Sequence, residues 1–126
     1  MNSLAGKRVL VVDDEPLNLK VATRMLKKLS MEAIPAETGR TAIDLAISEH
    51  FDVVLLDVQM PELDGFETAK LMRENNITAP IIAYTAHALG SDIERCLDAG
   101  MNEHIAKPVL LEDLEATIRK VLNNVK

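Results

Sequence analysis

Short runs of apolar residues alternate five times with stretches whose apolar residues recur at helical spacing, and this alternation limits the fold more than any other feature. Residues 9–12 and 53–56 are continuously apolar and rich in valine, which is typical of strands covered on both faces. Between them, Leu17, Val21 and Met25 fall on one face of a helix. The expected strands are residues 8–13, 31–35, 52–57, 80–85 and 103–106.

A repeated strand–helix order with short connections implies right-handed crossovers and a parallel sheet with helices on both faces. Five strands suit a flavodoxin-like α/β arrangement, a doubly wound (βα)5 fold with strand order 2-1-3-4-5. The chain has 126 residues, of which 48% are hydrophobic, enough for one core of ordinary size. We therefore expect residues 1–126 to form a single domain.

Composition excludes several classes of function. The formal net charge of −6 argues against a protein that binds nucleic acid. No apolar run approaches the ~18 residues that a membrane span needs, and the first residues lack the apolar segment of a signal peptide. The single cysteine, Cys96, cannot form an intrachain disulfide. We expect a cytoplasmic protein that is not inserted into a membrane.

Polar side chains stand where four of the expected strands end. Asp13 and Asp14 follow the first strand, Asp57 ends the third, Thr85 ends the fourth and Lys107 follows the fifth. The carboxyl ends of parallel strands meet at one edge of a sheet. Clustered carboxylates favour a hard cation such as Mg²⁺. A carboxylate can also attack phosphorus to give an acyl phosphate, provided that nearby positive charge neutralises the phosphoryl oxygens.

The acidic pair Asp13-Asp14, Asp57 before VQMPELDG, Thr85-Ala86 and Lys107-Pro108 occur in this order along the chain. In these motifs the sequence resembles, over essentially its whole length, the receiver (response-regulator) domains of two-component phosphorelay signalling. The resemblance implies that Asp57 accepts a phosphoryl group. Such a domain modifies its own side chain and then loses the group, so it is not a turnover enzyme acting on external substrates.

The resemblance also implies a metal site. Asp14, Asp57 and the backbone carbonyl of Gln59 would bind Mg²⁺ directly, with Mn²⁺ as an alternative, and Asp13 would hold the ion mainly through water. Glu15, beside Pro16, is expected only to begin a helix, where negative charge suits the helix dipole.

The remaining strand-end residues receive roles from the same resemblance. Lys107 would contact the incoming phosphoryl oxygen. Thr85 would move toward the attached group and switch the face formed by the fourth helix, the fifth strand and the fifth helix.

Three further segments, DDEPLNLKV, YTAHAL and GMNEHIAKPV, resemble receivers attached to hybrid sensor histidine kinases. The implied partners are a sensor histidine kinase, a histidine phosphotransfer domain, or both. The donor would be a phosphohistidine, and the acyl phosphate would be lost by hydrolysis or passed onward.

One residue departs from the family's usual sequence, and two others stand where the family adjusts the lifetime of the acyl phosphate. His104 stands three residues before Lys107, where the family usually carries an aromatic residue, so the readout at this face is expected to be altered or pH-sensitive. His87 and Gln59 occupy positions that flank the phosphoryl group in the family. Substituting either is expected to change the lifetime of the acyl phosphate more than the stability of the fold.

Local signals also predict helix starts and one turn. Asp64 and Ser91 each stand three residues before a glutamate, as the first residue of a capping box does. Gly65 is expected to supply a turn with positive φ that leads into the third helix.

Three other functions are compatible with an α/β fold of this kind. A dehalogenase-like phosphatase needs a second carboxylate two residues after its nucleophile, but Gln59 follows Asp57 at that distance. A flavodoxin-like cofactor site needs amides or hydroxyls after the first strand, where Asp13, Asp14 and Glu15 would repel a phosphate. An interaction module that no longer accepts a phosphoryl group remains an alternative.

Overall fold

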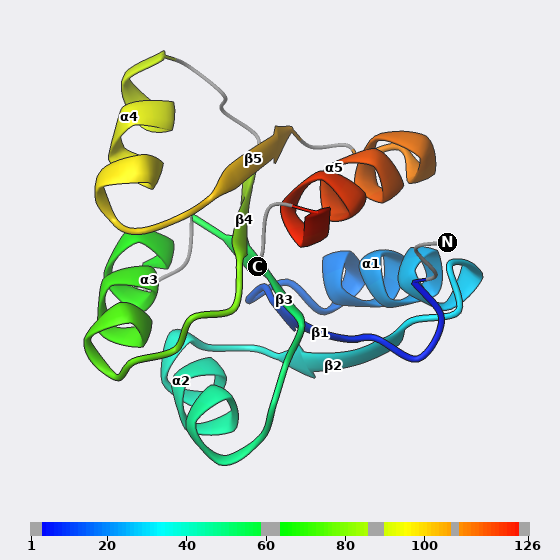
Figure 1. Cartoon of the computed structure of the whole chain (residues 1–126), viewed down its shortest axis with the longest axis horizontal. Coiled ribbons are helices and arrows are strands. Elements are labelled where there is room, and N and C mark those ends of the chain that lie inside the picture. The colour runs from blue at the N-terminus through cyan, green and yellow to red at the C-terminus, as the bar shows by residue number, and fades with distance from the viewer. Residues whose placement is uncertain (1–3, 59–63, 86–89, 107–108, 124–126) are drawn as a thin grey trace.

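A computed structural model describes residues 4–58, 64–85, 90–106 and 109–123, without the side chains of residues 90–93. Strands and helices alternate along the chain (Figure 1). The strands are β1 (Arg8–Val12), β2 (Glu32–Ala36), β3 (Val53–Asp57), β4 (Ile81–Thr85) and β5 (Glu103–Ala106). The helices are α1 (Pro16–Lys28), α2 (Gly39–Ser48), α3 (Gly65–Glu74), α4 (Gly90–Asp98) and α5 (Leu111–Asn123).

The five strands form one parallel sheet in the order β2-β1-β3-β4-β5, which confirms the flavodoxin-like arrangement. Strand limits differ from the expected ones by at most one residue at either end. Asp13 lies just beyond β1 rather than within it, and its carboxylate accepts a hydrogen bond from the backbone N–H of Glu15 at 2.9 Å.

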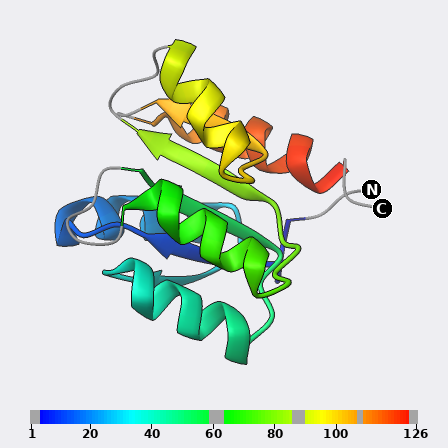
Figure 2. The same ribbon diagram turned by 90° about the vertical axis from the view of Figure 1, so that its left-hand side faces the viewer.

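Helices cover both faces of the sheet, with α1 and α5 on one face and α2, α3 and α4 on the other (Figures 1 and 2). Successive residues of a strand point to opposite faces, so Val12 and Leu56 pack toward α2–α4 while Val11 and Leu55 pack toward α1 and α5. All four are at most 1% exposed. Burial on both faces explains why β1 and β3 read as uninterrupted apolar runs.

The predicted helix starts had different outcomes. Asp64 begins α3 as expected, since its Oδ1 accepts a hydrogen bond from the backbone N–H of Glu67 at 2.9 Å. The prediction for Ser91 is wrong, because α4 has already begun at Gly90. A local capping signal does not decide the first residue of a helix when its neighbour can also adopt the helical conformation. None of the described helices is long and apolar enough to cross a membrane.

Candidate functional site

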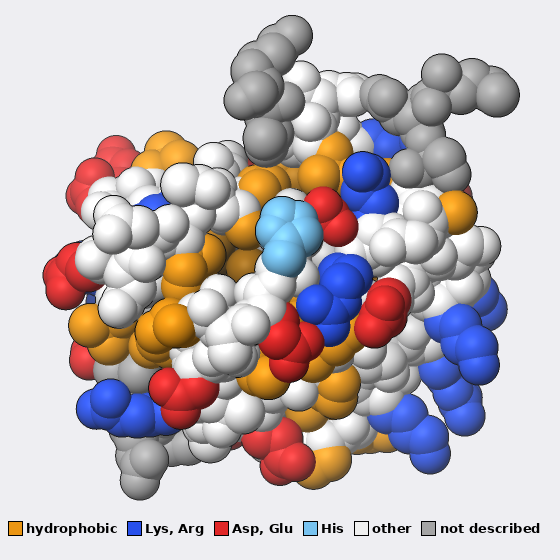
Figure 3. Space-filling view, turned by 60° about the horizontal axis from the view of Figure 1, so that its bottom comes forward, with side chains coloured by type: hydrophobic (Ala, Val, Ile, Leu, Met, Phe, Trp, Pro, Cys, Tyr) orange, Lys and Arg blue, Asp and Glu red, His pale blue; other side chains and the backbone are white. Residues whose placement is uncertain are grey.

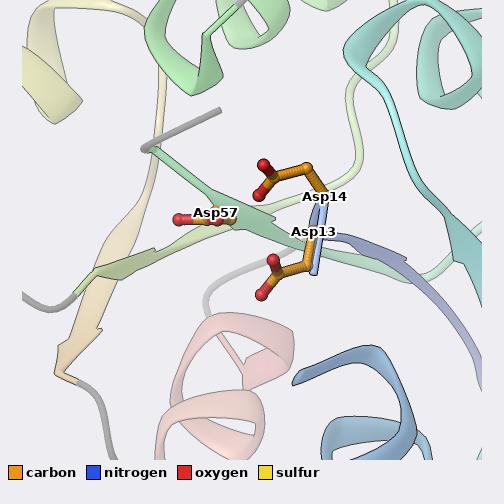
Figure 4. Close-up of side chains that lie close together, drawn as sticks. All are labelled: Asp13, Asp14 and Asp57. Carbon is orange, nitrogen blue, oxygen red and sulfur yellow. The ribbon is translucent and has the colours of Figure 1, made fainter. Parts of the chain in front are cut away.

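Three aspartates meet at the carboxyl edge of the sheet. Asp13 and Asp14 follow β1 and Asp57 ends β3; these strands pair with Val12 opposite Leu56. Each aspartate offers one carboxylate oxygen that lies within 4.8 Å of the other two. Figure 4 shows the three carboxylates pointing to the same side, past the ends of the strands. The structure therefore brings together the three aspartates that the sequence singled out.

Burial makes this cluster energetically unusual. Asp13 is 1% exposed and Asp57 is 2% exposed, whereas Asp14 is exposed to solvent. Like charges held this close repel one another, and the repulsion grows as water is removed. A divalent cation relieves it, and a donor set made of oxygen atoms alone suits Mg²⁺ or a similar hard ion. The residues present thus fit the metal that the sequence led us to expect.

Backbone contacts hold Asp13 in place. Besides the bond from Glu15, the backbone N–H of Asp13 donates to the carbonyl of Ala36 at 3.1 Å. Glu15 itself is the residue that precedes α1, with Pro16 as the first helical residue, as expected. The side chain of Glu15 accepts a hydrogen bond from the backbone N–H of Leu17 at 3.4 Å, so its carboxylate caps the N-terminus of α1.

Gly65 lies against the main chain of Asp57. A Cβ atom on Gly65 would stand 2.5 Å from the carbonyl oxygen of Asp57 and 2.5 Å from the Cα of Val58. The prediction of a positive φ is wrong, because among the described residues the glycines with positive φ are Gly6 and Gly100. Gly65 is required here by close approach: the start of α3 packs directly onto the backbone that carries Asp57.

Thr85 lies at the same edge of the sheet. It ends β4, is 3% exposed, and pairs with Ala106 at the end of β5. The backbone N–H of Val58, next to Asp57, donates to the carbonyl of Tyr84 at 3.4 Å, so the ends of β3 and β4 are joined beside the cluster. Thr85 is thus buried beside the acidic cluster, while its switching role stays a prediction.

Three of the expected site residues, Gln59, His87 and Lys107, lie outside the described residues. Their roles stay predictions.

His104 lies in β5 beside a charge pair. Its Nδ1 is 3.6 Å from Oε1 of Glu103, and the other carboxylate oxygen of Glu103 is 2.8 Å from Nζ of Lys120 on α5. The hydrogen bond from Lys120 holds the pKa of Glu103 below its usual value. The face of β5 and α5 therefore carries an anchored carboxylate next to the imidazole, and the expected pH sensitivity of this face stays a prediction.

One contact near the site gave no signal in the sequence. Phe66 follows Gly65, is 9% exposed, and lies under the guanidinium of Arg95 from α4, 4.0 Å from the ring centroid. The two residues are far apart in the chain, and an exposed arginine on a helix looks like any solvated charge. Only the packing of α4 beside α3 brings them together.

Together these features define a class of protein: a doubly wound α/β domain with a cluster of carboxylates that could hold a metal ion at the carboxyl edge of its sheet. The family model for the response regulator receiver domain matches residues 9–119. The chain belongs to this family, and the resemblance seen in the sequence is confirmed.

Relatives and solved structures agree with this assignment. The chain is 35% identical over 118 residues to the sensor histidine kinase RcsC of Escherichia coli strain K12, matching 94% of this chain but 12% of RcsC. It is 36% identical over 123 residues to the sensor protein GacS of Pseudomonas syringae pv. syringae, covering 94% of this chain and 14% of GacS. The chain thus spans only a small part of these curated relatives. The similarity to receivers of hybrid sensor histidine kinases is confirmed.

Solved structures show the same fold. The receiver domain of the sensor histidine kinase PA1611 from Pseudomonas aeruginosa PAO1 superposes with a TM-score of 0.86 and 36% identity, covering 94% of this chain and 99% of that one. That receiver has a magnesium ion coordinated in its active site cleft. The chemotaxis protein CheY4 of Vibrio cholerae superposes with a TM-score of 0.87 and 30% identity, covering 94% of this chain and 100% of that one.

Proposed function

We propose that residues 1–126 act as one receiver domain, a signalling switch that accepts a phosphoryl group on Asp57 in the presence of Mg²⁺. The observation that carries the proposal is the geometry of Asp13, Asp14 and Asp57. Their carboxylate oxygens lie within 4.8 Å of one another at the carboxyl edge of a parallel sheet, where such folds bind ligands.

In the proposed phosphoryl transfer, the residues at this edge of the sheet have different roles. A carboxylate oxygen of Asp57 attacks the phosphorus of a phosphohistidine; the new O–P bond forms as the P–N bond breaks, and the imidazole leaves. Asp13, Asp14, Asp57 and the backbone carbonyl of Gln59 would hold the metal. When bound, Mg²⁺ neutralises charge on the phosphoryl oxygens and orients the donor. Water or an acceptor histidine later removes the group.

The other residues of the edge have supporting roles in this proposal. Lys107 contacts a phosphoryl oxygen as a point charge. Thr85, buried at the end of β4, moves toward the attached group and repositions the face formed by α4, β5 and α5. The backbone contacts of Asp13 and the close fit of Gly65 against Asp57 keep the carboxylates in place before transfer begins.

The proposed donors are a sensor histidine kinase, a histidine phosphotransfer domain, or both. The support comes from the relatives, since RcsC is named a sensor histidine kinase and GacS a sensor protein. We place the protein in the cytoplasm, since its sequence contains one cysteine, Cys96, which cannot form an intrachain disulfide, and such cysteine usage suits a reducing compartment.

Intact-mass spectrometry with acetyl phosphate tests the proposal. The wild-type protein is expected to gain one phosphoryl group with Mg²⁺ and essentially none with a chelator. Asp57→Asn is expected to gain none. Asp44→Asn, on the exposed side of α2, is the matched control and should react like wild type. A wild-type protein that gains no phosphoryl group with Mg²⁺ contradicts the proposal and favours an interaction module that has lost the chemistry.

A further inference from the structure

A side chain of helix α4 contacts the first turn of α3, directly after the glycine that packs against the backbone of Asp57. The guanidinium of Arg95 stands 4.0 Å above the centroid of the Phe66 ring. The other side of the ring belongs to the core, where Phe66 clusters with Val58, Ala83 and Cys96. Phe66 is therefore held between the sheet and a cation on α4.

Phe66 is closely coupled to the main chain of Asp57. The preceding residue, Gly65, has no room for even a Cβ against the Asp57 carbonyl and the Val58 Cα. The backbone N–H of Gly65 also donates to the carbonyl of Val58 at 3.3 Å. Any displacement of the Phe66 ring that shifts the start of α3 must therefore shift the backbone that carries the acceptor carboxylate.

The far end of α4 is tied down independently. Arg73 of α3 donates from Nε to the carbonyl of Gly100 at 3.0 Å and from Nη2 to Oδ1 of Asn102 at 2.8 Å, just after α4 ends. A Cβ on Gly100 would stand 2.7 Å from Cγ of Arg73, so this junction is tightly packed. The segment after α4 is therefore anchored to α3 through Arg73, independently of the contact between Arg95 and Phe66.

We propose that Arg95 and Phe66 are positioning residues for transfer to Asp57: their stacking contact holds the β3–α3 junction so that the Asp57 carboxylate is correctly placed. This inference rests on the proposed function and adds a route of regulation that is separate from Thr85. By linkage, a ligand that binds α4 and draws Arg95 away from the ring slows transfer to Asp57, and transfer in turn alters the affinity for that ligand.

The first test measures the rate of phosphorylation by acetyl phosphate at saturating Mg²⁺. An exposed cation–π contact is worth about 0.5–1 kcal/mol, so Arg95→Ala is expected to react about 2- to 5-fold more slowly. Phe66→Leu, which keeps an apolar side chain but removes the aromatic face, should slow the reaction similarly. The double variant should be no slower than the slower single variant, because both changes remove the same contact.

Two matched variants separate positioning from general effects of charge and stability. Arg95→Lys keeps the charge and can still stack, so its rate should lie between those of wild type and Arg95→Ala. Arg119→Ala removes an arginine of α5 that is paired with Glu115, and its rate should equal that of wild type. Wild-type rates in Arg95→Ala, or additive effects in the double variant, overturn the inference.

A second measurement does not need phosphorylation. Hydrogen exchange at the amides of Val58 and Gly65, followed without any phosphodonor, is expected to be faster in Arg95→Ala and in Phe66→Leu than in Arg119→Ala. Unchanged exchange at both amides contradicts the inference even if the protein accepts a phosphoryl group. Failure of the wild-type protein to accept the group contradicts the proposed function, while the exchange data still decide whether the contact holds the junction.

Discussion

Charged side chains are arranged differently at the two ends of the sheet. At the carboxyl ends of the strands, Asp13, Asp14 and Asp57 place like charges within 4.8 Å of one another. At the amino ends, charges of opposite sign are interleaved. Arg8 lies 2.7 Å from Glu49 and 3.6 Å from Glu32, measured between guanidinium nitrogens and carboxylate oxygens.

Arg8 makes several further contacts at the amino end of the sheet. Arg8 also donates to the carbonyl of His50 at 2.9 Å and lies 4.8 Å from the ring centroid of Phe51. The carboxylate of Asp52 accepts the backbone N–H of Arg8 at 2.8 Å. The hydrogen bond with Glu49 raises the pKa of Arg8 above its usual value. Figure 3 shows this side of the molecule, where acidic and basic side chains lie next to one another.

A hollow of about 790 Å³ adjoins these pairs, lined by residues of α2, the start of β3, the α3–β4 connection and α5. In Figure 3 hydrophobic side chains are visible in the hollow beside the charged groups. This end is thus held by paired charges and loop contacts, while the other end gathers repelling carboxylates. Among the described residues, opposite charges are thus paired at the amino end, whereas at the carboxyl end three like charges lie together where a cation would offset their repulsion.

The largest expected effect is at the amino end, at Arg73. This side chain is partly buried, which lowers its pKa, and it donates to the carbonyls of Ala79 and Gly100 and to Asn102. Arg73→Met leaves these acceptors without their donor and is expected to lower the free energy of unfolding by about 3 kcal/mol. Urea denaturation measures the change, and Arg119→Met is the control. A loss below about 0.5 kcal/mol, the size typical of ordinary surface changes, would show that this end does not depend on its arginines.

The next effect compares two glycines, one at each end. Gly65→Ala places a Cβ 2.5 Å from the Asp57 backbone, so about 1–3 kcal/mol of stability should be lost together with affinity for Mg²⁺. Gly6→Ala meets open space, and only its φ of +80° is unfavourable, at a cost of about 1 kcal/mol. Urea denaturation and Mg²⁺ titration distinguish them. Equal Mg²⁺ affinity in both variants would show that the close approach of α3 does not shape the site.

A third prediction concerns the metal. Mg²⁺ at tenfold excess over its Kd should raise the free energy of unfolding by about 1.4 kcal/mol, since it binds only the folded state. Asp13→Asn and Asp57→Asn should lose this response, whereas Asp52→Asn, at the amino end, should keep it. Thermal melting with and without Mg²⁺ measures the effect. A response that Asp57→Asn retains would mean that the ion binds elsewhere.

The smallest effect is expected at Glu103, at the start of β5. Because Lys120 lowers the pKa of Glu103, the pair stabilises the fold at pH values above the ordinary carboxyl pKa of 4.5, and this stability is lost as the pH falls through the lowered pKa. Lys120→Met should therefore cost about 0.3–1 kcal/mol at neutral pH and nothing once the carboxyl group is protonated. Urea denaturation at several pH values checks the sign, and a cost that persists in acid would point to packing.

Much of the fold could be predicted because its signals are local. Continuous apolar runs identify β1 and β3 as strands buried on both faces, and the strand–helix alternation allows few topologies. The acidic cluster could also be predicted, since residues that end parallel strands share one edge of the sheet. The errors were local conformations: Gly65 has no positive φ, and Ser91 does not begin α4. For Gly65, the close packing of α3 against the backbone of Asp57 decided between alternatives that the local sequence leaves open.

By itself, the sequence determined the five strand–helix units and the chemistry at the carboxyl edge, because residue periodicity and the polarity of strand ends depend on near neighbours in the chain. The tertiary structure alone decided that α3 packs onto the backbone of Asp57, that Arg95 covers Phe66, and that Arg73 joins two distant connections. The contacts of Arg95 with Phe66 and of Arg73 with Gly100 join residues far apart in sequence, and all three contacts depend on distances that are set only when the helices are packed against the sheet.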